Sequence, residues 1–122
     1  MKVLVADDSK LMRHVLVKIL NEAGVESVVQ AWDGQAAVQK VEEEIPDIVL
    51  MDWIMPNMTG IEAVKKIRAS GNKVPIIMCT TEGEQNRIVD AIKAGANNFV
   101  VKPFDPKVIM EKIKETLAKV SA

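Results

Sequence analysis

Five short apolar runs alternate with five longer amphipathic stretches along the chain, and this alternation is the strongest constraint on its fold. Three of the runs, VLVA from Val3, IVLM from Ile48 and IIMC from Ile76, are continuously apolar. Such runs are typical of parallel strands that are covered on both faces of a sheet. The predicted strands span Val3–Ala6, Val25–Ala31, Asp47–Met51, Pro75–Cys79 and Asn98–Val101.

The stretches between the apolar runs have the period of amphipathic helices. Between Leu11 and Leu20 the apolar residues recur at intervals of three and four, which gathers them on one helix face and leaves His14 on the solvent face. Ser9 can cap the start of this helix, and Gly24 can end it. Four further helices are predicted at Gly34–Glu44, Ile61–Ser70, Glu84–Ala94 and Pro106–Lys119.

Five βα units in succession define a fold class. Strands joined by helices must run parallel, and right-handed crossovers place helices on both faces of an open sheet. We therefore predict an α/β fold, a doubly wound (βα)5 sandwich with a five-stranded parallel sheet in the flavodoxin-like order 2-1-3-4-5. Because no repeat or long linker divides the chain, we expect residues 1–122 to form a single domain with no separate output domain.

Charge and hydropathy exclude several classes of protein. With 16 Lys and Arg against 17 Asp and Glu, the net charge is −1, and the chain lacks the basic field of a nucleic-acid-binding protein. The lone Cys79 cannot form an intramolecular disulfide, and we expect a buried thiol without a redox role. The sequence has neither a signal peptide nor a run of about 18 apolar residues, so we expect a soluble, cytoplasmic protein without membrane insertion.

Polar side chains stand at the ends of four predicted strands. Asp7 and Asp8 follow the first strand, Asp52 the third, Thr80 the fourth and Lys102 the fifth. In the predicted order the reversal lies between strands one and three, so the three carboxylates should converge in one crevice. Clustered carboxylates need a cation or shared protons, and an oxygen-only ligand set with room for waters suits Mg²⁺. Together with an ammonium and a hydroxyl, the set is suited to binding a phosphoryl group.

The motifs at these strand ends resemble those of one protein family. They are the acidic pair in VADDS, the stretch DWIMPNMTG from Asp52 to Gly60, Thr80 in MCTT and the sequence FVVKPF from Phe99 to Phe104. The chain resembles a response-regulator receiver domain and is most similar to the stand-alone chemotaxis (CheY-like) type. The resemblance spans essentially residues 2–120, with the motifs in order at all four functional strand ends.

The resemblance implies an aspartyl-phosphate switch in two-component signal transduction. Asp52 would be phosphorylated by a partner histidine kinase. Asp8 and Asp52 would bind Mg²⁺ together with the backbone carbonyl of Ile54, and Asp7 would orient a metal-bound water. Lys102 would pair with the acceptor carboxylate and afterwards with the phosphoryl oxygens. The chain would be a phosphoacceptor rather than an enzyme, apart from self-catalysed phosphotransfer and autodephosphorylation.

The resemblance also implies how phosphorylation would change the surface. Thr80 would turn to hydrogen-bond the phosphoryl group, and Phe99 would move inward in step. The Lys102–Pro103 peptide bond is expected to be cis. A phosphoryl group adds roughly −1.5 to −2 charge, enough to bias a loop that is balanced between two states.

Ile54 departs from the family pattern. In chemotaxis proteins with a DWNMPNM stretch, the position two after the acceptor is Asn, and here it is Ile54. An apolar side chain cannot hydrogen-bond an incoming water or a phosphatase group, so we predict slower dephosphorylation and leave the action of such a phosphatase open. Glu82, two residues beyond Thr80, is the other predicted tuner of that rate.

Several functions are compatible with these features. The leading hypothesis is a monomeric binding module whose phosphorylated form binds the flagellar motor switch, with Ile88–Ala94, Phe99 and Lys102–Lys114 as the candidate docking surface. A phosphorelay or kinase-regulating receiver would use the same pocket. An aspartate-nucleophile phosphohydrolase is disfavoured, because such enzymes commonly separate their two aspartates by one residue and need room for a cap. An inactive scaffold is disfavoured by the complete pocket.

Overall fold

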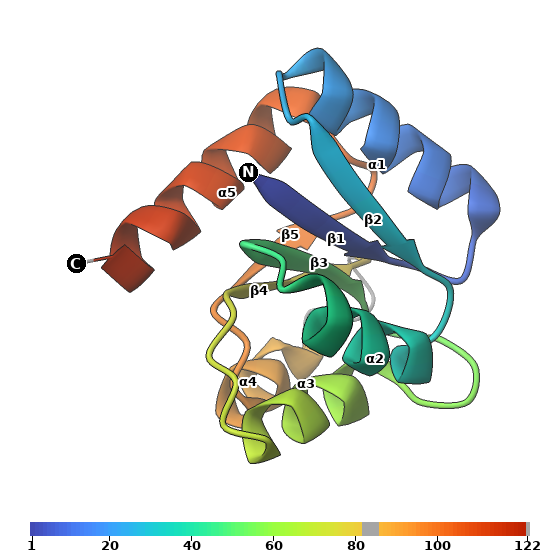
Figure 1. Cartoon of the computed structure of the whole chain (residues 1–122), viewed down its shortest axis with the longest axis vertical. Helices are drawn as coiled ribbons and strands as arrows, with labels where there is room; N and C mark the ends of the chain where they lie inside the picture. The colour runs from blue at the N-terminus through green and yellow to red at the C-terminus, as the bar shows by residue number, and fades with distance from the viewer. Residues whose placement is uncertain (82–85, 122) are drawn as a thin grey trace.

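A five-stranded parallel sheet forms the centre of the molecule (Figure 1). The computed structural model describes residues 1–81 and 86–121. The strand order is β2-β1-β3-β4-β5 and every strand pair is parallel, which confirms the predicted fold class. The elements in chain order are β1 (Lys2–Ala6), α1 (Lys10–Glu22), β2 (Ser27–Ala31), α2 (Gly34–Glu44), β3 (Ile48–Asp52), α3 (Gly60–Ala69), β4 (Ile76–Thr80), α4 (Ile88–Ala94), β5 (Asn98–Val101) and α5 (Pro106–Ser121).

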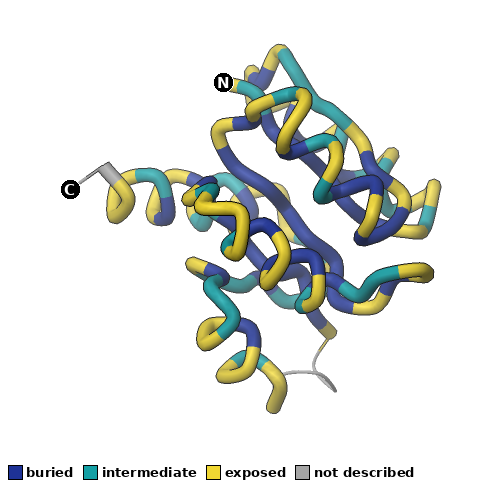
Figure 2. Tube along the Cα trace, turned by 60° about the horizontal axis from the view of Figure 1, so that its bottom comes forward, coloured by how far each residue is buried: buried dark blue, intermediate teal, exposed yellow. Residues whose placement is uncertain are grey.

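Two groups of helices cover the two faces of this sheet (Figure 1). On one face Leu16 and Leu20 of α1 and Ile109 and Ile113 of α5 are fully buried, while His14 of α1 is exposed as predicted. Helices α2, α3 and α4 cover the other face. Figure 2 shows buried central strands between helices whose outer sides are exposed. Every residue of β3 and β4 is buried, as expected from their continuously apolar sequences.

Capping residues determine where the helices begin. The side chain of Ser9 accepts a hydrogen bond from the Met12 amide at the start of α1, which confirms the predicted cap. Thr59 and Glu62 form a reciprocal capping box, and α3 therefore begins at Gly60, one residue before the predicted start. Helix α2 and strand β5 have the predicted bounds.

One strand starts two residues later than predicted, and one predicted helix start falls outside the described residues. Strand β2 begins at Ser27 rather than Val25, because the Val25 amide donates to the Leu20 carbonyl and so belongs to the turn that ends α1. Helix α4 is described from Ile88, and the predicted start at Glu84 lies outside the described residues.

The sheet topology places the carboxyl ends of all five strands at one edge. In the register, Asp52 of β3 pairs with Cys79 of β4, and Thr80 pairs with Val101 of β5. The residues that follow β1, β3, β4 and β5 are thereby brought to a common edge. Within residues 1–81 and 86–121, no helix is both long and apolar enough to cross a membrane.

Candidate functional site

Three carboxylates meet at the carboxyl ends of β1 and β3. Asp7 and Asp8 follow β1, Asp52 ends β3, and one oxygen from each lies within 4.8 Å of the other two. Asp7 and Asp52 are buried, with 2% and 7% of their surface exposed, whereas Asp8 is open to solvent. The structure therefore brings together the three residues that the strand order predicted to converge.

Asp7 is fixed by the backbone around it. Its Oδ1 accepts a hydrogen bond from the Ser9 amide at 2.8 Å, and its carbonyl accepts one from Arg13 Nη1 at 2.7 Å. The other carboxylate oxygen, Oδ2, is buried and has no hydrogen-bond partner in the described part of the chain. Its nearest cationic partner is Lys102 Nζ at 3.6 Å. A buried oxygen in this condition carries an uncompensated desolvation cost, which a bound cation would offset.

Lys102 reaches the cluster from the end of β5. Its Nζ lies 2.8 Å from Asp52 Oδ1, and the side chain is 21% exposed. The centroid of the Phe104 ring lies 6.0 Å from the same nitrogen. The peptide bond between Lys102 and Pro103 is cis, the expected form.

Burial and charge pairing oppose each other in this cluster. Burial raises the pKa of the Asp52 carboxyl above its ordinary value, the hydrogen bond from Lys102 lowers it, and the charge of Asp7 raises it; the net shift is upward. Burial alone would lower the pKa of Lys102, but the hydrogen bond and charge of Asp52, with the charge of Asp7, raise it. Both shifts favour protonation: burial disfavours the charged form of Asp52, and two neighbouring carboxylates favour the charged form of Lys102.

The donor set of the cluster fits Mg²⁺. The three converging ligand atoms are carboxylate oxygens, which hard divalent cations prefer. The exposed side of Asp8 leaves space for the waters that usually complete an octahedral Mg²⁺ site. The buried, unpartnered Asp7 Oδ2 is the oxygen whose desolvation such a cation would offset.

Thr80 lies beside the cluster, but its hydroxyl is engaged by the backbone. Thr80 is 1% exposed, and its Oγ1 donates to the carbonyl of Thr81 at 3.1 Å. The Thr80 carbonyl accepts a hydrogen bond from the Lys102 amide at 2.7 Å, which joins the ends of β4 and β5. The hydroxyl would have to turn away from Thr81 to reach a group attached to Asp52.

Phe99 connects the last strand to the outer helices. It is half-buried and packs against the core cluster that contains Ala91 of α4. On its other side, Lys112 Nζ of α5 lies 5.3 Å from the ring centroid. A movement of this ring would therefore alter the surface at α4 and α5.

A hydrogen-bonded pair that the sequence analysis missed anchors the loop after Asp52. Asp33 Oδ1 caps α2 by accepting from the Ala36 amide at 2.6 Å, and Asp33 Oδ2 accepts from Asn57 Nδ2 at 2.6 Å. Asn57 has φ 66°, a left-handed conformation that Asn adopts more readily than most residues. An Asp before a helical pattern is a readable cap signal, whereas its bond to a residue 24 positions away has no sequence signal.

Gly60 is required by the close return of the chain to β3. A Cβ at this position would overlap the carbonyl oxygen of Asp52. The Gly60 amide donates to the Trp53 carbonyl at 2.8 Å, so the start of α3 is bonded directly to the end of β3. The glycine thus holds the loop that carries Ile54 beside the acidic cluster.

The residues that flank Asp52 differ in exposure. Trp53 is 6% exposed, and Arg87 Cζ lies 5.8 Å from its ring centroid, a contact that no sequence pattern indicates. Ile54, two residues after Asp52, is 60% exposed, so its apolar side chain is open to solvent. Glu82, the other predicted tuner of dephosphorylation, lies outside the described residues.

Comparison with known families and curated proteins gives concordant matches. The family model of the response regulator receiver domain matches residues 3–114. The chain is 44% identical over 120 residues to chemotaxis protein CheY1 of Helicobacter pylori strain J99, covering 96% of this chain and 97% of that protein. It is 43% identical over 116 residues to chemotaxis protein CheY of Bacillus subtilis strain 168, covering 95% and 97% of the two chains.

Solved structures give the same result. The chemotaxis protein CheY4 of Vibrio cholerae superposes with a TM-score of 0.86 at 35% identity, covering 94% of this chain and 97% of that chain. The response regulator domain of Thermotoga maritima CheB superposes with a TM-score of 0.87 at 35% identity, covering 97% and 96%. The similarity therefore extends over nearly the whole of each chain.

Proposed function

This chain belongs to the response regulator receiver domain family, and from that membership we propose that Asp52 accepts a phosphoryl group from a histidine kinase. Receiver domains of this type are switches in two-component signalling. The observation that carries the proposal is the 2.8 Å contact between Lys102 Nζ and Asp52 Oδ1 inside the acidic cluster. This contact orients the carboxylate that ends β3.

The transfer step makes Asp52 the nucleophile. A carboxylate oxygen of Asp52 attacks the phosphorus of the kinase's phosphohistidine, so that an O–P bond forms and the P–N bond breaks. The leaving imidazole nitrogen keeps the electron pair and takes up a proton. Because a carboxylate is a weak nucleophile, much of the acceleration must come from alignment, to which Lys102 contributes through its hydrogen bond.

The acidic residues prepare the site for charge neutralisation. Mg²⁺ held by Asp8, Asp52 and the backbone carbonyl of Ile54, with Asp7 orienting a water of the ion, would offset the negative charge of the transferring group. Lys102, which is protonated at neutral pH, supplies a second positive charge and would then bond the phosphoryl oxygens. The support for this arrangement is the convergence of the three carboxylates and the unpartnered Asp7 Oδ2.

The switch would start at Thr80. Its hydroxyl would leave the Thr81 carbonyl and donate to a phosphoryl oxygen, and Phe99 would follow inward. Because Phe99 packs on the core beside α4 and lies under Lys112, this motion would change the docking surface at Ile88–Ala94, Phe99 and Lys102–Lys114. The added charge and three acceptor oxygens supply the differential interaction that such a change requires.

We place the function in chemotaxis, with the flagellar motor switch as the target of the phosphorylated form. The support is that relatives covering nearly the whole chain bear the names of chemotaxis proteins. A histidine kinase would be the phosphoryl donor, and a phosphatase could shorten the signal. The chain itself contributes only phosphotransfer to Asp52 and hydrolysis of the aspartyl phosphate.

Trp53 provides a direct test. Trp32 is 56% exposed and would add a separate signal, so a Trp32→Phe background isolates the fluorescence of the buried Trp53. We expect this fluorescence to change with Mg²⁺ and again with a small acyl phosphate, and the intact mass to rise by one phosphoryl group. The matched control, Asp52→Asn in the same background, should gain no mass. A mass gain in both proteins, no gain in either, or rapid turnover of phosphate esters would overturn the proposal.

A further inference from the structure

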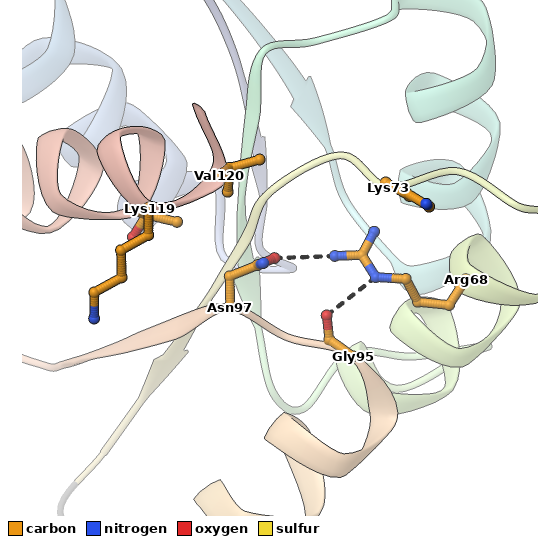
Figure 3. A pocket seen from close by; sticks show the side chains of 7 residues that line it. Arg68, Lys73, Gly95, Asn97, Lys119 and Val120 are labelled. Atoms are coloured by element: carbon orange, nitrogen blue, oxygen red, sulfur yellow. Dashed lines mark hydrogen bonds between the residues drawn. The ribbon is translucent and has the colours of Figure 1, made fainter. Parts of the chain in front are cut away.

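A second concentration of charge lies at the amino ends of β4 and β5, the opposite edge of the sheet from Asp52. Here a hollow of about 430 Å³ is lined by Arg68, Lys73, Asn97, Thr116 and Lys119, among others (Figure 3). We call it the basic hollow. Three of its lining side chains are cations and none of those that line it is a carboxylate, in a chain whose net charge is −1.

Arg68 is fixed at the wall of the basic hollow by neutral acceptors. Nε donates to the Gly95 carbonyl and Nη2 donates to Asn97 Oδ1, each at 3.0 Å (Figure 3). Nη1 donates to the Asn72 carbonyl, also at 3.0 Å. A guanidinium group has five N–H donors, so two remain. No described carboxylate lies within salt-bridge distance of Arg68. Burial lowers the pKa of this group, the sign of a charge that is desolvated without a counter-charge.

The neutral lining of the basic hollow also offers donors. Asn97 Oδ1 is used twice, by Arg68 and by the Ile76 amide, whereas Asn97 Nδ2 has no hydrogen-bond partner among residues 1–81 and 86–121. Thr116 Oγ1 is already occupied, since it donates to the Lys112 carbonyl and accepts from Asn98 Nδ2. The groups left to meet a ligand are therefore N–H donors.

Two lysines stand at the rim with freedom to move. Lys73 is exposed, and none of the ion pairs in the described ranges includes it. Lys119 has 74% of its side chain exposed and lies 3.9 Å from Glu115, which also pairs with Lys112. Such an exposed pair contributes little energy, so Lys119 can turn toward a ligand at small cost.

We propose that the basic hollow binds an oxyanion with two or more negative charges, with Arg68 and Asn97 as fixed donors and Lys73 and Lys119 closing over it. A planar guanidinium matches phosphoryl and carboxylate oxygens, and charge-assisted hydrogen bonds are the strong ones. The volume lies within the range of small-molecule sites. The ligand class is therefore a small phosphorylated or polycarboxylate compound, at a site separate from Asp52.

A purely structural role for the same cations is the alternative interpretation, and it predicts a different result for oxyanion binding. Arg68 and Lys119 lie in the last turns of α3 and α5, where helix dipoles favour positive charge. That role accounts for their positions, but it gives no use to the free Asn97 amide group or to the two remaining Arg68 N–H donors. If the cations only stabilise helix ends, the chain will bind no oxyanion at this edge.

The test is a calorimetric titration of the full chain with inorganic pyrophosphate and, separately, with citrate. Protein and buffers are freed of metal ions on a chelating resin beforehand, because EDTA is itself a polycarboxylate and a metal ion could bridge either anion to the acidic cluster. Saturable binding of either anion is expected, and the stronger of the two shows whether phosphoryl or carboxylate groups are preferred. Asp52→Asn should bind the same anion with unchanged affinity, since the two sites lie at opposite edges. No saturable heat with either anion would overturn the proposal.

Matched lysine variants locate the binding without disturbing Arg68, which has structural bonds. Lys73→Gln combined with Lys119→Gln should weaken the affinity by about tenfold, because two charge-assisted contacts are lost. The control, Lys18→Gln combined with Lys114→Gln, removes the same charge from exposed positions elsewhere on the chain. It should change the anion affinity by less than about twofold, because long-range charge effects are screened by salt. An equal loss of anion affinity in the two double variants would contradict the assignment. So would anion-induced ¹⁵N amide chemical-shift changes that appear near Asp52 instead of at Gly95 and Asn97.

Discussion

Lys102 Nζ donates to Asp52 Oδ1 at 2.8 Å, and this one contact spans three neighbouring strands. Asp52 ends β3, Lys102 follows β5, and β4 lies between them in the sheet. The lysine side chain therefore crosses the carboxyl end of β4, where Thr80 is located. The Asp52 carboxylate, the Lys102 ammonium group and the Thr80 hydroxyl are thus placed together by three elements that are separate in sequence.

Lys102→Gln should destabilise the chain measured without Mg²⁺. The substitution leaves Asp52 and Asp7 buried near each other with no cation beside them. We expect the free energy of unfolding in urea to fall by about 1 kcal/mol, less than for a fully buried pair because Lys102 is partly exposed. The control is Lys107→Gln, which removes the charge of an exposed lysine on α5. Equal urea midpoints for the two variants would contradict the prediction.

Asp52→Asn should stabilise the metal-free chain at neutral pH. Burial raises the folded pKa of Asp52, so its contribution to stability is present below the unfolded pKa and is lost as the pH rises through the folded pKa. The variant does not ionise and should gain about 1 kcal/mol over the parent at pH 7 in EDTA, with a smaller difference near pH 4. Urea unfolding at the two pH values measures this. A difference in unfolding free energy between the variant and the parent that grows toward acidic pH would contradict the prediction.

Mg²⁺ should reverse that order of stability. A ligand that binds only the folded chain stabilises it by mass action, by about 2.7 kcal/mol at a concentration 100 times the dissociation constant. We expect added Mg²⁺ to raise the unfolding midpoint of the parent and to have much less effect on Asp52→Asn, which lacks one carboxylate of the cluster. Thermal unfolding with and without EDTA provides the measurement. An equal shift in both proteins would show that the ion binds elsewhere.

Ile54→Asn should shorten the lifetime of the phosphorylated chain. Ile54, two residues after Asp52, is 60% exposed, and an amide at that position can hydrogen-bond an attacking water. We expect the half-life, followed by loss of the phosphoryl mass, to fall by roughly twofold to tenfold, the range of one added hydrogen bond. Val89→Asn has equal exposure on α4 and serves as the control. An unchanged half-life in Ile54→Asn would refute the idea.

Asn57→Gly should lower the Mg²⁺ affinity of the chain and reduce its free energy of unfolding only modestly. Glycine keeps the positive φ of this position but removes the amide that bonds Asp33, so only the anchor of the loop is lost. We expect a loss of about 1 kcal/mol of stability and a weaker Mg²⁺ titration followed through Trp53. Asp33→Ala removes the helix cap as well and should cost more stability. If Asn57→Gly leaves the Mg²⁺ affinity unchanged, the anchor has no role in the site.

Helix and strand positions were predictable because they depend on local patterns. Continuously apolar runs identified β3 and β4, and the periodicity from Leu11 to Leu20 identified α1 with its cap at Ser9. The start of β2 was wrong by two residues because the bond from Val25 to Leu20 extends the turn after α1. No hydrophobic pattern records a backbone bond of that kind.

The convergence of the acidic residues was also predictable, since it depends only on strand order and on where polar residues follow apolar runs. From the amino-acid pattern alone it follows that Asp7, Asp8 and Asp52 share one end of a parallel sheet. Other contacts became known from the folded chain: Thr80 bonds the Thr81 carbonyl, Asp33 accepts from Asn57, and Arg68 lines the basic hollow with Lys73 and Lys119. These contacts join side chains from different elements, and their geometry depends on how the helices pack against the sheet rather than on any local pattern.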